Sequence, residues 1–100
     1  MSLLLMTPEE MKQHIAKKAQ DKRLYLNLSQ KSLSERSGVS FGTLKKFERT
    51  GKISLESLLK LALVLECLEQ FRDLFKLPNP IELSSIDELL KDNTRKRGRK

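Results

Sequence analysis

Histidine and cysteine, the side chains best suited to nucleophilic or metal chemistry, each occur once in this chain. His14 and Cys67 are far apart, and no spacing typical of metal ligands or of a phosphate-binding loop surrounds either residue. His14 is therefore expected to be a surface residue rather than a catalyst. An internal disulfide is excluded, which suits a reducing cytosol, and Cys67 is expected to be a small buried hydrophobe on a helix. The sequence predicts no enzymatic activity, no metal site and no cofactor.

The chain carries an excess of positive charge. It has 20 basic and 13 acidic residues and a formal net charge of +7, which favours a polyanionic partner. Five of these charges lie at the end of the chain, at Arg95, Lys96, Arg97, Arg99 and Lys100, so the first 94 residues carry only +2. Binding by the rest of the chain must therefore depend on where its cations are placed.

The basic tail allows two interpretations. Arg97, Gly98 and Arg99 resemble the Arg-Gly-Arg centre of an AT-hook, which inserts two arginines into a narrow A·T-rich minor groove. The prolines usual around that centre are missing, which favours a generic phosphate-binding tail. In either case, if all five tail cations met phosphates, deleting them would lower the salt slope of binding by about four to five, at about 0.9 per contact.

Further cations lie in residues 28–51, a stretch typical of two short helices joined by a tight turn. Ser29 is placed to accept a backbone N–H at a helix start, so the first helix is expected to begin at Gln30. Gly38 can adopt the left-handed conformation that ends a helix, and Val39 would fill the turn. The pattern predicts a first helix that turns sharply into a second.

The second helix would be capped by Ser40 and would end near Gly51. Leu44 and Phe47 are three residues apart, so both lie on one face. The rest of the helix surface then carries small, aromatic and basic residues: Phe41, Gly42, Thr43, Lys45, Lys46 and Arg49. An ordinary helical hairpin with a solvated basic face also fits this spacing, but the two caps, the turn and the charge together favour a helix-turn-helix with one face free to enter a major groove.

The preceding element has a compact start signal: Thr7 as N-cap, Pro8 at the first helical position and Glu10 for a capping box. This helix should run from Pro8 to about residues 24–26, where Asn27 can accept a left-handed backbone. A buried stripe is expected on it, formed by Met11, Ile15 and Ala19.

Two further helices are expected after residue 53. Ser54 would cap a fourth helix, and its apolar residues are too many for one face, which predicts burial on most sides; they are Leu55, Leu58, Leu59, Leu61, Ala62, Val64 and Leu65. Residues 68–77 read as a fifth helix. Its apolar face is a candidate homodimer interface, with completion of the core as the alternative; the residues are Leu68, Phe71, Leu74 and Phe75.

These elements divide the chain into four parts. Residues 1–6 form an apolar arm, either a disordered start or a pairing segment, and residues 7–77 form the helical domain. Residues 78–92 are expected to be a proline linker with a short helix, and residues 93–100 a disordered basic tail. No apolar run approaches the length of a membrane span or the pattern of a signal peptide, so we expect a cytoplasmic protein.

Residues 11–75 resemble the lambda-repressor-like domain of the Cro and cI class (XRE type), an all-α, five-helix DNA-binding fold. The matching motifs are KRLYLNLSQ (22–30), SERSGVS (34–40), TLKKFERTGK (43–52) and SLESLLKLALVL (54–65). The resemblance implies that Gln30 contacts a phosphate and braces the recognition helix, and that Ser40 touches the DNA backbone. It also implies that bases are met by Phe41, Gly42, Thr43 and Lys46.

The family often has an ion pair between the end of its first helix and the recognition helix, which the resemblance places at Arg23 and Glu48. One departure concerns base readout: Gly42 has no side chain, and Phe41 offers only apolar contact, for instance to a thymine methyl group. Specificity is then expected to be shared with DNA shape and half-site spacing. With Lys45, Arg49 and Lys52 added, the expected DNA-binding set is Gln30, Ser40, Phe41, Gly42, Thr43, Lys45, Lys46, Arg49, Lys52, Arg95, Lys96, Arg97, Arg99 and Lys100.

At finer resolution, residues 54–75, with a proline linker and a basic tail after them, are similar to the HipB-like antitoxins encoded beside HipA-type kinases. This resemblance implies a dimer that represses its own operon and binds a kinase toxin. The leading hypothesis is therefore a homodimeric, sequence-specific repressor of a palindromic operator on double-stranded DNA, which is also the autoregulating antitoxin of a HipA-type toxin-antitoxin operon. A stand-alone XRE-type or phage-like repressor is the alternative. An RNA-binding module is disfavoured because Tyr25 and Phe41 are its only plausible stacking platforms.

Overall fold

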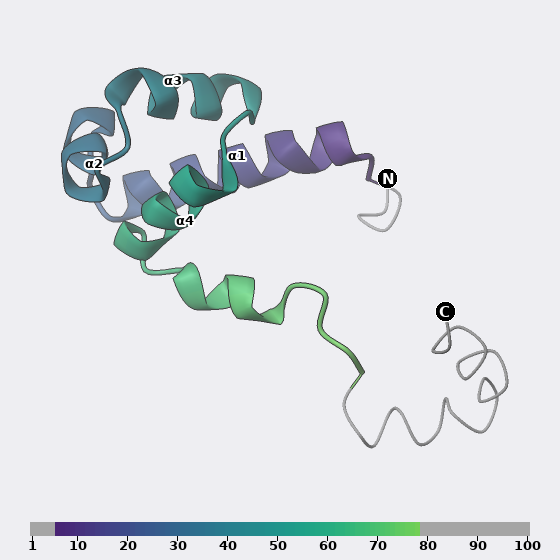
Figure 1. Ribbon diagram of the computed structural model, residues 1–100. Coiled ribbons are helices and arrows are strands. Elements are labelled where there is room, and N and C mark those ends of the chain that lie inside the picture. Colours follow the sequence, from purple (N-terminus) through teal and green to yellow (C-terminus); the bar gives the residue numbers. More distant parts are fainter. Residues whose placement is uncertain (1–5, 79–100) are drawn as a thin grey trace, which may run out of the picture.

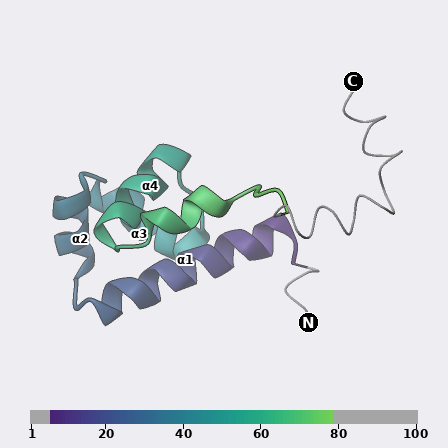
Figure 2. The same ribbon diagram turned by 90° about the horizontal axis from the view of Figure 1, so that it is seen from below.

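The computed structural model describes residues 6–78, and every regular element in that part is helical. The elements are α1 (Pro8–Tyr25), α2 (Gln30–Ser37), α3 (Phe41–Thr50), α4 (Leu55–Val64) and the 3-10 helix η2 (Leu68–Asp73) (Figure 1). α1 runs along the length of the domain, and the other helices lie on one side of it (Figure 2). The all-α, five-helix prediction is confirmed. The expectations for residues 1–5, for the linker helix beyond residue 78 and for the basic tail lie outside the described part.

The helices begin where the sequence signals predict. Thr7 and Glu10 form both hydrogen bonds of a capping box at the start of α1. Ser29, Ser40 and Ser54 each accept the backbone N–H three residues further on, at 2.9, 3.1 and 3.1 Å. These local bonds satisfy N–H groups that have no acceptor inside the helix, and they fix each boundary to the residue.

The helices end in left-handed backbone. Asn27 has a φ of 60°, and Gly38 and Gly51 each have a φ of 80°. Gly51 is required for a second reason: a Cβ at this position would lie 2.9 Å from backbone atoms of Lys12 in α1. The end of α3 therefore packs directly on α1.

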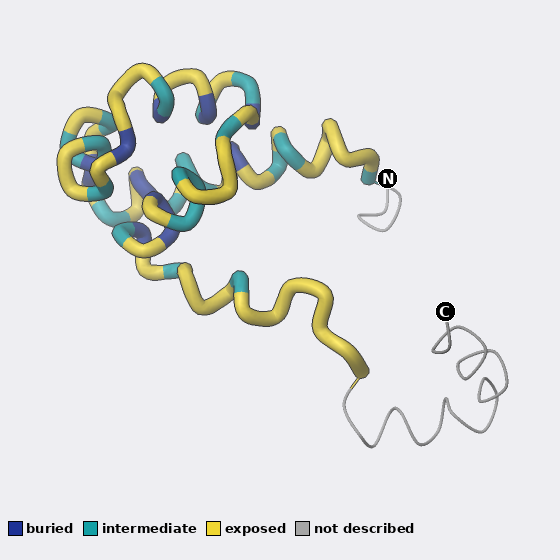
Figure 3. The backbone as a smooth tube through the Cα atoms, in the orientation of Figure 1, coloured by how far each residue is buried: buried dark blue, intermediate teal, exposed yellow. Residues whose placement is uncertain are grey.

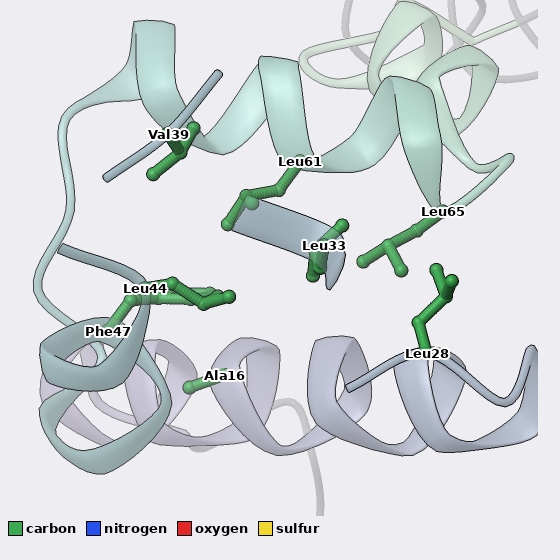
Figure 4. Packing of buried hydrophobic residues seen from close by; sticks show 8 residues of the cluster. All are labelled: Ala16, Leu28, Leu33, Val39, Leu44, Phe47, Leu61 and Leu65. Carbon is green, nitrogen blue, oxygen red and sulfur yellow. The ribbon is translucent and has the colours of Figure 1, made fainter. Parts of the chain in front are cut away.

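The core lies between α1 and the three helices beside it, and the inward sides of the helices carry the buried residues (Figure 3). Leu44 and Phe47 of α3 lie over Ala16 of α1 (Figure 4). The complete cluster is Ala16, Leu28, Leu33, Val39, Leu44, Phe47, Leu61 and Leu65. The cluster is almost entirely aliphatic, with Phe47 as its one ring.

The buried stripe expected on α1 is wrong in part. The exposed fractions of Met11 and Ile15 are 39% and 36%, and the residues that α1 buries are Ala16 and Arg23. Small Ala16 allows α3 to approach closely, so the line of contact runs along a neighbouring side of the helix. Met11 and Ile15 instead line an open groove beside η2.

The expectations for the last two helices also need correction. α4 is buried on one face only, because Leu61 and Ala62 are buried whereas Leu55 and Leu63 are 64% and 63% exposed. The fifth helix is a six-residue 3-10 helix that stops at Asp73, has no side-chain cap and buries none of its residues. An uncapped segment with so little tertiary packing lacks the contacts that stabilise a longer α-helix.

Candidate nucleic-acid interface

α3 has two chemically different faces. Leu44 and Phe47, each 1% exposed, anchor its inner face in the core. The outer face is exposed to solvent and carries Phe41, Gly42, Lys45, Lys46 and Arg49. The structure therefore brings five of the expected DNA-binding residues together on one surface.

The N-terminal turn of α3 is held by a pair of hydroxyl groups. Ser40 Oγ accepts from the backbone N–H of Thr43 at 3.1 Å and lies 2.8 Å from Thr43 Oγ1, to which it donates. Ser40 is exposed and Thr43 is half-buried. These two bonds hold the first turn of α3, and the Thr43 hydroxyl, which only accepts in this pair, keeps its own hydrogen to donate.

Phe41 and Lys45 interact with each other on the outer face. The Lys45 Nζ lies 5.2 Å from the centroid of the Phe41 ring, and Phe41 is 45% exposed. The pair has the i, i+4 spacing of residues stacked along a helix, and a cation over an aromatic ring is stabilising. The lysine therefore holds the ring against the helix, an arrangement that the sequence reasoning missed although the spacing signals it.

A buried ion pair joins α1 to α3. Arg23 Nε and Nη2 donate to Glu48 Oε2 and Oε1 at 2.7 and 3.1 Å, and the two side chains are only 8% and 5% exposed. Arg23 Nη1 also donates to the backbone carbonyl of Leu28 at 2.8 Å. The ion pair implied by the family resemblance is present, and its link to the turn between α1 and α2 is an addition that no sequence spacing signals.

Gln30, the first residue of α2, completes this network. Its Nε2 donates to Glu48 Oε1 at 2.8 Å, so three helices meet at one carboxylate. An amide nitrogen carries two hydrogens, and Glu48 takes one of them. The second hydrogen leaves Gln30 able to donate to an external acceptor such as a phosphate while it braces α3.

The far end of α3 is tied to α1 by a different contact, which sequence reasoning also missed. Gln13 Nε2 donates to the Thr50 carbonyl at 3.0 Å. Lys52 follows this end of α3 and is exposed, so it lies at the opposite end of the helix from Phe41. The Lys12 hydrogen bond and charge hold the pKa of Glu9, on α1, below its usual value, and the charge of Lys52 adds a smaller contribution. Lys52 is therefore placed to reach the flank of a site rather than its centre.

An apolar groove of about 550 Å³ lies on another part of the domain, between α1, α4 and η2. Phe71 and Leu74 line it, together with His14 and Cys67, both of which are half-buried. Cys67 is thus less buried than expected, and His14 is less exposed. Among the described residues, no group of histidine, cysteine and acidic side chains is arranged to hold a metal ion.

Together, the capped turn, the buried anchor of α3 and its exposed basic face define a helix-turn-helix DNA-binding domain. Residues 20–70, just over half of the chain, match the family described as Helix-turn-helix. The chain therefore belongs to this family of lambda-repressor-like, XRE-type DNA-binding transcription regulators. A comparison with curated proteins gives no match. In the part of the chain that the structure describes, no helix has the length and apolar character needed to cross a membrane.

Proposed function

We propose that this DNA-binding regulator is a sequence-specific repressor that acts by occupying its operator as a homodimer. The observation that carries the proposal is the three-helix network at Glu48, because it fixes the outer face of α3 relative to α1 and α2. A recognition helix held in this way can enter a major groove without reorganising. Repression then follows from occlusion of the promoter and needs no chemistry.

In this proposal the contacts fall into two groups. Gln30 and Ser40 bind phosphates, and Arg49 and Lys52 extend the phosphate contacts along the flank. Base edges are met by Phe41, Gly42, Thr43, Lys45 and Lys46. Thr43 accepts from Ser40 and keeps its own hydroxyl hydrogen, so the side chains that can donate hydrogen bonds to bases are Thr43 and the two lysines. Lysine donates well to guanine acceptors, so a guanine within reach of Lys46 is expected in the operator.

The dimer is proposed to form through the exposed apolar surface after α4. Leu68, Leu74 and Phe75 are 37%, 56% and 98% exposed, and half-buried Phe71 lies beside them. Phe75 also has a φ of 60°, which is uncommon for a bulky residue. Burial of these side chains in a partner would offset both the cost of exposing apolar surface and the cost of the unusual backbone conformation at Phe75. A two-fold axis at this surface would set the two α3 helices on half-sites about 34 Å apart.

An electrophoretic shift assay with the DNA upstream of the gene tests the proposal. The expected result is a saturable shift at low salt that excess random DNA does not displace. Absence of binding at low salt would overturn the proposal.

A Lys46→Ala variant tests how recognition of the operator is divided between Lys46 and the shape and half-site spacing of the DNA. We expect weaker binding with some remaining preference for the operator, because shape and spacing also contribute. Lys17→Ala is the matched control, since Lys17 is an exposed lysine on α1 whose ion pair with Asp21 is at the surface. Complete loss of discrimination in Lys46→Ala would show that readout is concentrated at this one residue.

The second proposal is that the repressor is also the antitoxin of a HipA-type kinase. The support is the resemblance of residues 54–75 to HipB-like proteins and the apolar surface that this region exposes. Co-expression with the neighbouring reading frame tests it: co-purification of a kinase-like protein supports an antitoxin. A phage-type or metabolic neighbour that does not co-purify supports a stand-alone XRE-type repressor.

A further inference from the structure

The apolar groove between α1, α4 and η2 presents side chains that a further element could cover. Met11 and Ile15 on its α1 wall are 39% and 36% exposed, and Leu74 on its η2 wall is 56% exposed. Two buried residues of α4, Leu61 and Ala62, form its floor. Exposed apolar surface that is continuous with a core is typical of a docking site.

The charged side chains of this groove are all basic. Lys18 and Lys22 lie on the α1 wall, one helical turn apart. Lys18 is exposed, and the Nζ of Lys22 lies 5.6 Å from the centroid of the Tyr25 ring. None of the described residues that line the groove is acidic. The groove therefore favours an occupant that is apolar on one face and negatively charged at its edges.

Residues 81–92 of the same chain have this composition. They include four acidic residues and one lysine, a net charge of −3, although the chain as a whole carries +7. Three apolar residues at spacings of three and four would share one face of a helix; they are Ile86, Leu89 and Leu90. Residues 1–5 and 93–100, which also lie outside the described part, contain no acidic residue. Charge and pattern together select residues 81–92.

We propose that residues 81–92 dock in this groove on their own chain, with the apolar face against α4 and the acidic residues beside the two lysines. The described chain ends at Pro78, four residues after Leu74 in the groove wall. Ile86 is eight residues beyond Pro78, a reach of up to about 26 Å. The α1 wall, from Met11 to Lys22, is only about 16 Å long. The segment can therefore reach every part of the groove.

Apolar burial supplies most of the docking free energy, because exposed ion pairs contribute little. A short helix is marginal in isolation, so the groove and the segment stabilise each other. Docking would cover Phe71 and Leu74, which line the groove. Leu68 and Phe75 do not line it and would remain for the proposed dimer. The inference goes beyond the proposed function and does not depend on DNA binding.

The accessibility of Cys67, the one cysteine of the chain, reports on docking because this residue lines the groove. Its reaction with iodoacetamide, an uncharged reagent, is measured on the full chain. Ile86→Asp places a charge on the apolar face and should weaken docking about tenfold or more, so Cys67 should react faster by a similar factor. Ser84→Asp adds the same charge away from that face and should leave the rate unchanged. Equal rates in both variants would overturn the inference.

The contribution of the basic wall is measured in the same way. Lys18→Glu should accelerate the reaction of Cys67 by about two- to fivefold, because the docked segment loses an attractive charge. Loss of a nearby cation would by itself slow the reaction, since it disfavours the thiolate. Lys17→Glu is the matched control, because Lys17 is exposed on α1 and does not line the groove. A slower reaction in Lys18→Glu would overturn the proposed pairing with an acidic segment.

Disulfide trapping then identifies which chain supplies the segment. Cysteines are introduced singly as Ile86→Cys, Leu89→Cys and Leu90→Cys, with Ser84→Cys as the control for a tether of similar length. Under mild oxidation, at least one of the three should form an intramolecular disulfide with Cys67 faster than the control. Equal rates in all four variants, or disulfide-linked dimers instead, would overturn docking on the same chain. No DNA is present, so the proposed repressor function can fail or stand independently.

Discussion

The helix-turn-helix and the segment that follows α4 are built in opposite ways. From α1 to α4 every helix start is capped by a side chain, and the inner faces are buried. After α4, η2 has no side-chain cap and buries nothing, and Phe75 and Leu77 are 98% and 81% exposed. The first region specifies its own structure, whereas the second leaves apolar surface that another molecule can cover.

The buried polar side chains of the helix-turn-helix also find their hydrogen-bonding partners within the domain. Arg23 is buried, but all of its hydrogen-bonding partners come from within the domain. Among the described residues, no buried side-chain nitrogen or oxygen lacks a partner. The helix-turn-helix is thus complete in itself, and changes inside it should affect stability. Changes in the segment after α4 should affect association instead.

The largest expected effect is at the buried ion pair. Arg23→Met leaves the Glu48 carboxylate buried with Gln30 as its remaining partner, which should destabilise the domain by about 3–5 kcal/mol. Thermal unfolding should then occur about 12 °C lower or more. In a double variant, Arg23→Met with Glu48→Leu, part of this loss should return. A double variant no more stable than Arg23→Met would contradict the assignment of the cost to an unpaired charge.

The next largest loss of stability is expected at the two glycines that end α2 and α3. Gly38→Ala should cost about 1–2 kcal/mol, because a side chain disfavours the left-handed conformation. Gly51→Ala should cost more, since its Cβ would also collide with the Lys12 backbone at 2.9 Å. Urea unfolding of the two variants measures the difference. Equal losses would mean that α1 does not pack closely on the end of α3.

A substitution in the segment after α4 should separate association from stability. Phe75→Ser removes an exposed ring, so the stability of the protomer should change by no more than about 0.5 kcal/mol. The proposed dimer should dissociate at higher concentration, as measured by sedimentation equilibrium. Leu55→Ser is the matched control, because Leu55 is 64% exposed on α4. Dissociation in Leu55→Ser, but not in Phe75→Ser, would move the interface to α4.

The smallest expected effect concerns Cys67. Burial raises the pKa of its thiol, and the charge of Lys22 offsets this only in part. A raised pKa means less thiolate at a given pH, so modification by a thiol reagent should be slow near neutrality and should accelerate at higher pH than for an exposed cysteine. The rate measured against pH checks this. A midpoint at or below that of an exposed thiol would contradict it.

The sequence predicts those features of the fold that depend on short-range signals. Caps such as Ser29 and Ser40 and the left-handed Gly38 act within four residues, so both helix boundaries of the turn follow from them. Short-range signals do not predict which residues of α1 are buried, because whether Ile15 or Ala16 faces the core depends on how closely α3 approaches. The shortness of η2 also depends on missing tertiary contacts rather than on its apolar spacing.

The sequence also predicts part of the candidate site. The exposed position of Lys46 follows from helical periodicity, but the pairing of Arg23 with Glu48 came only from family resemblance, since residues so far apart carry no spacing signal.

The convergence of three helices on Glu48 also has a consequence for engineering. Residues 28–51 cannot be transplanted as a self-contained recognition cassette, because Arg23, which orients α3, lies outside them. Retargeting the domain to a new operator should therefore leave Arg23, Gln30 and Glu48 unchanged and vary the outer positions of α3. Libraries confined to positions 41, 42, 45 and 46 would vary the proposed base-contacting positions while preserving the Arg23–Glu48–Gln30 network that orients α3.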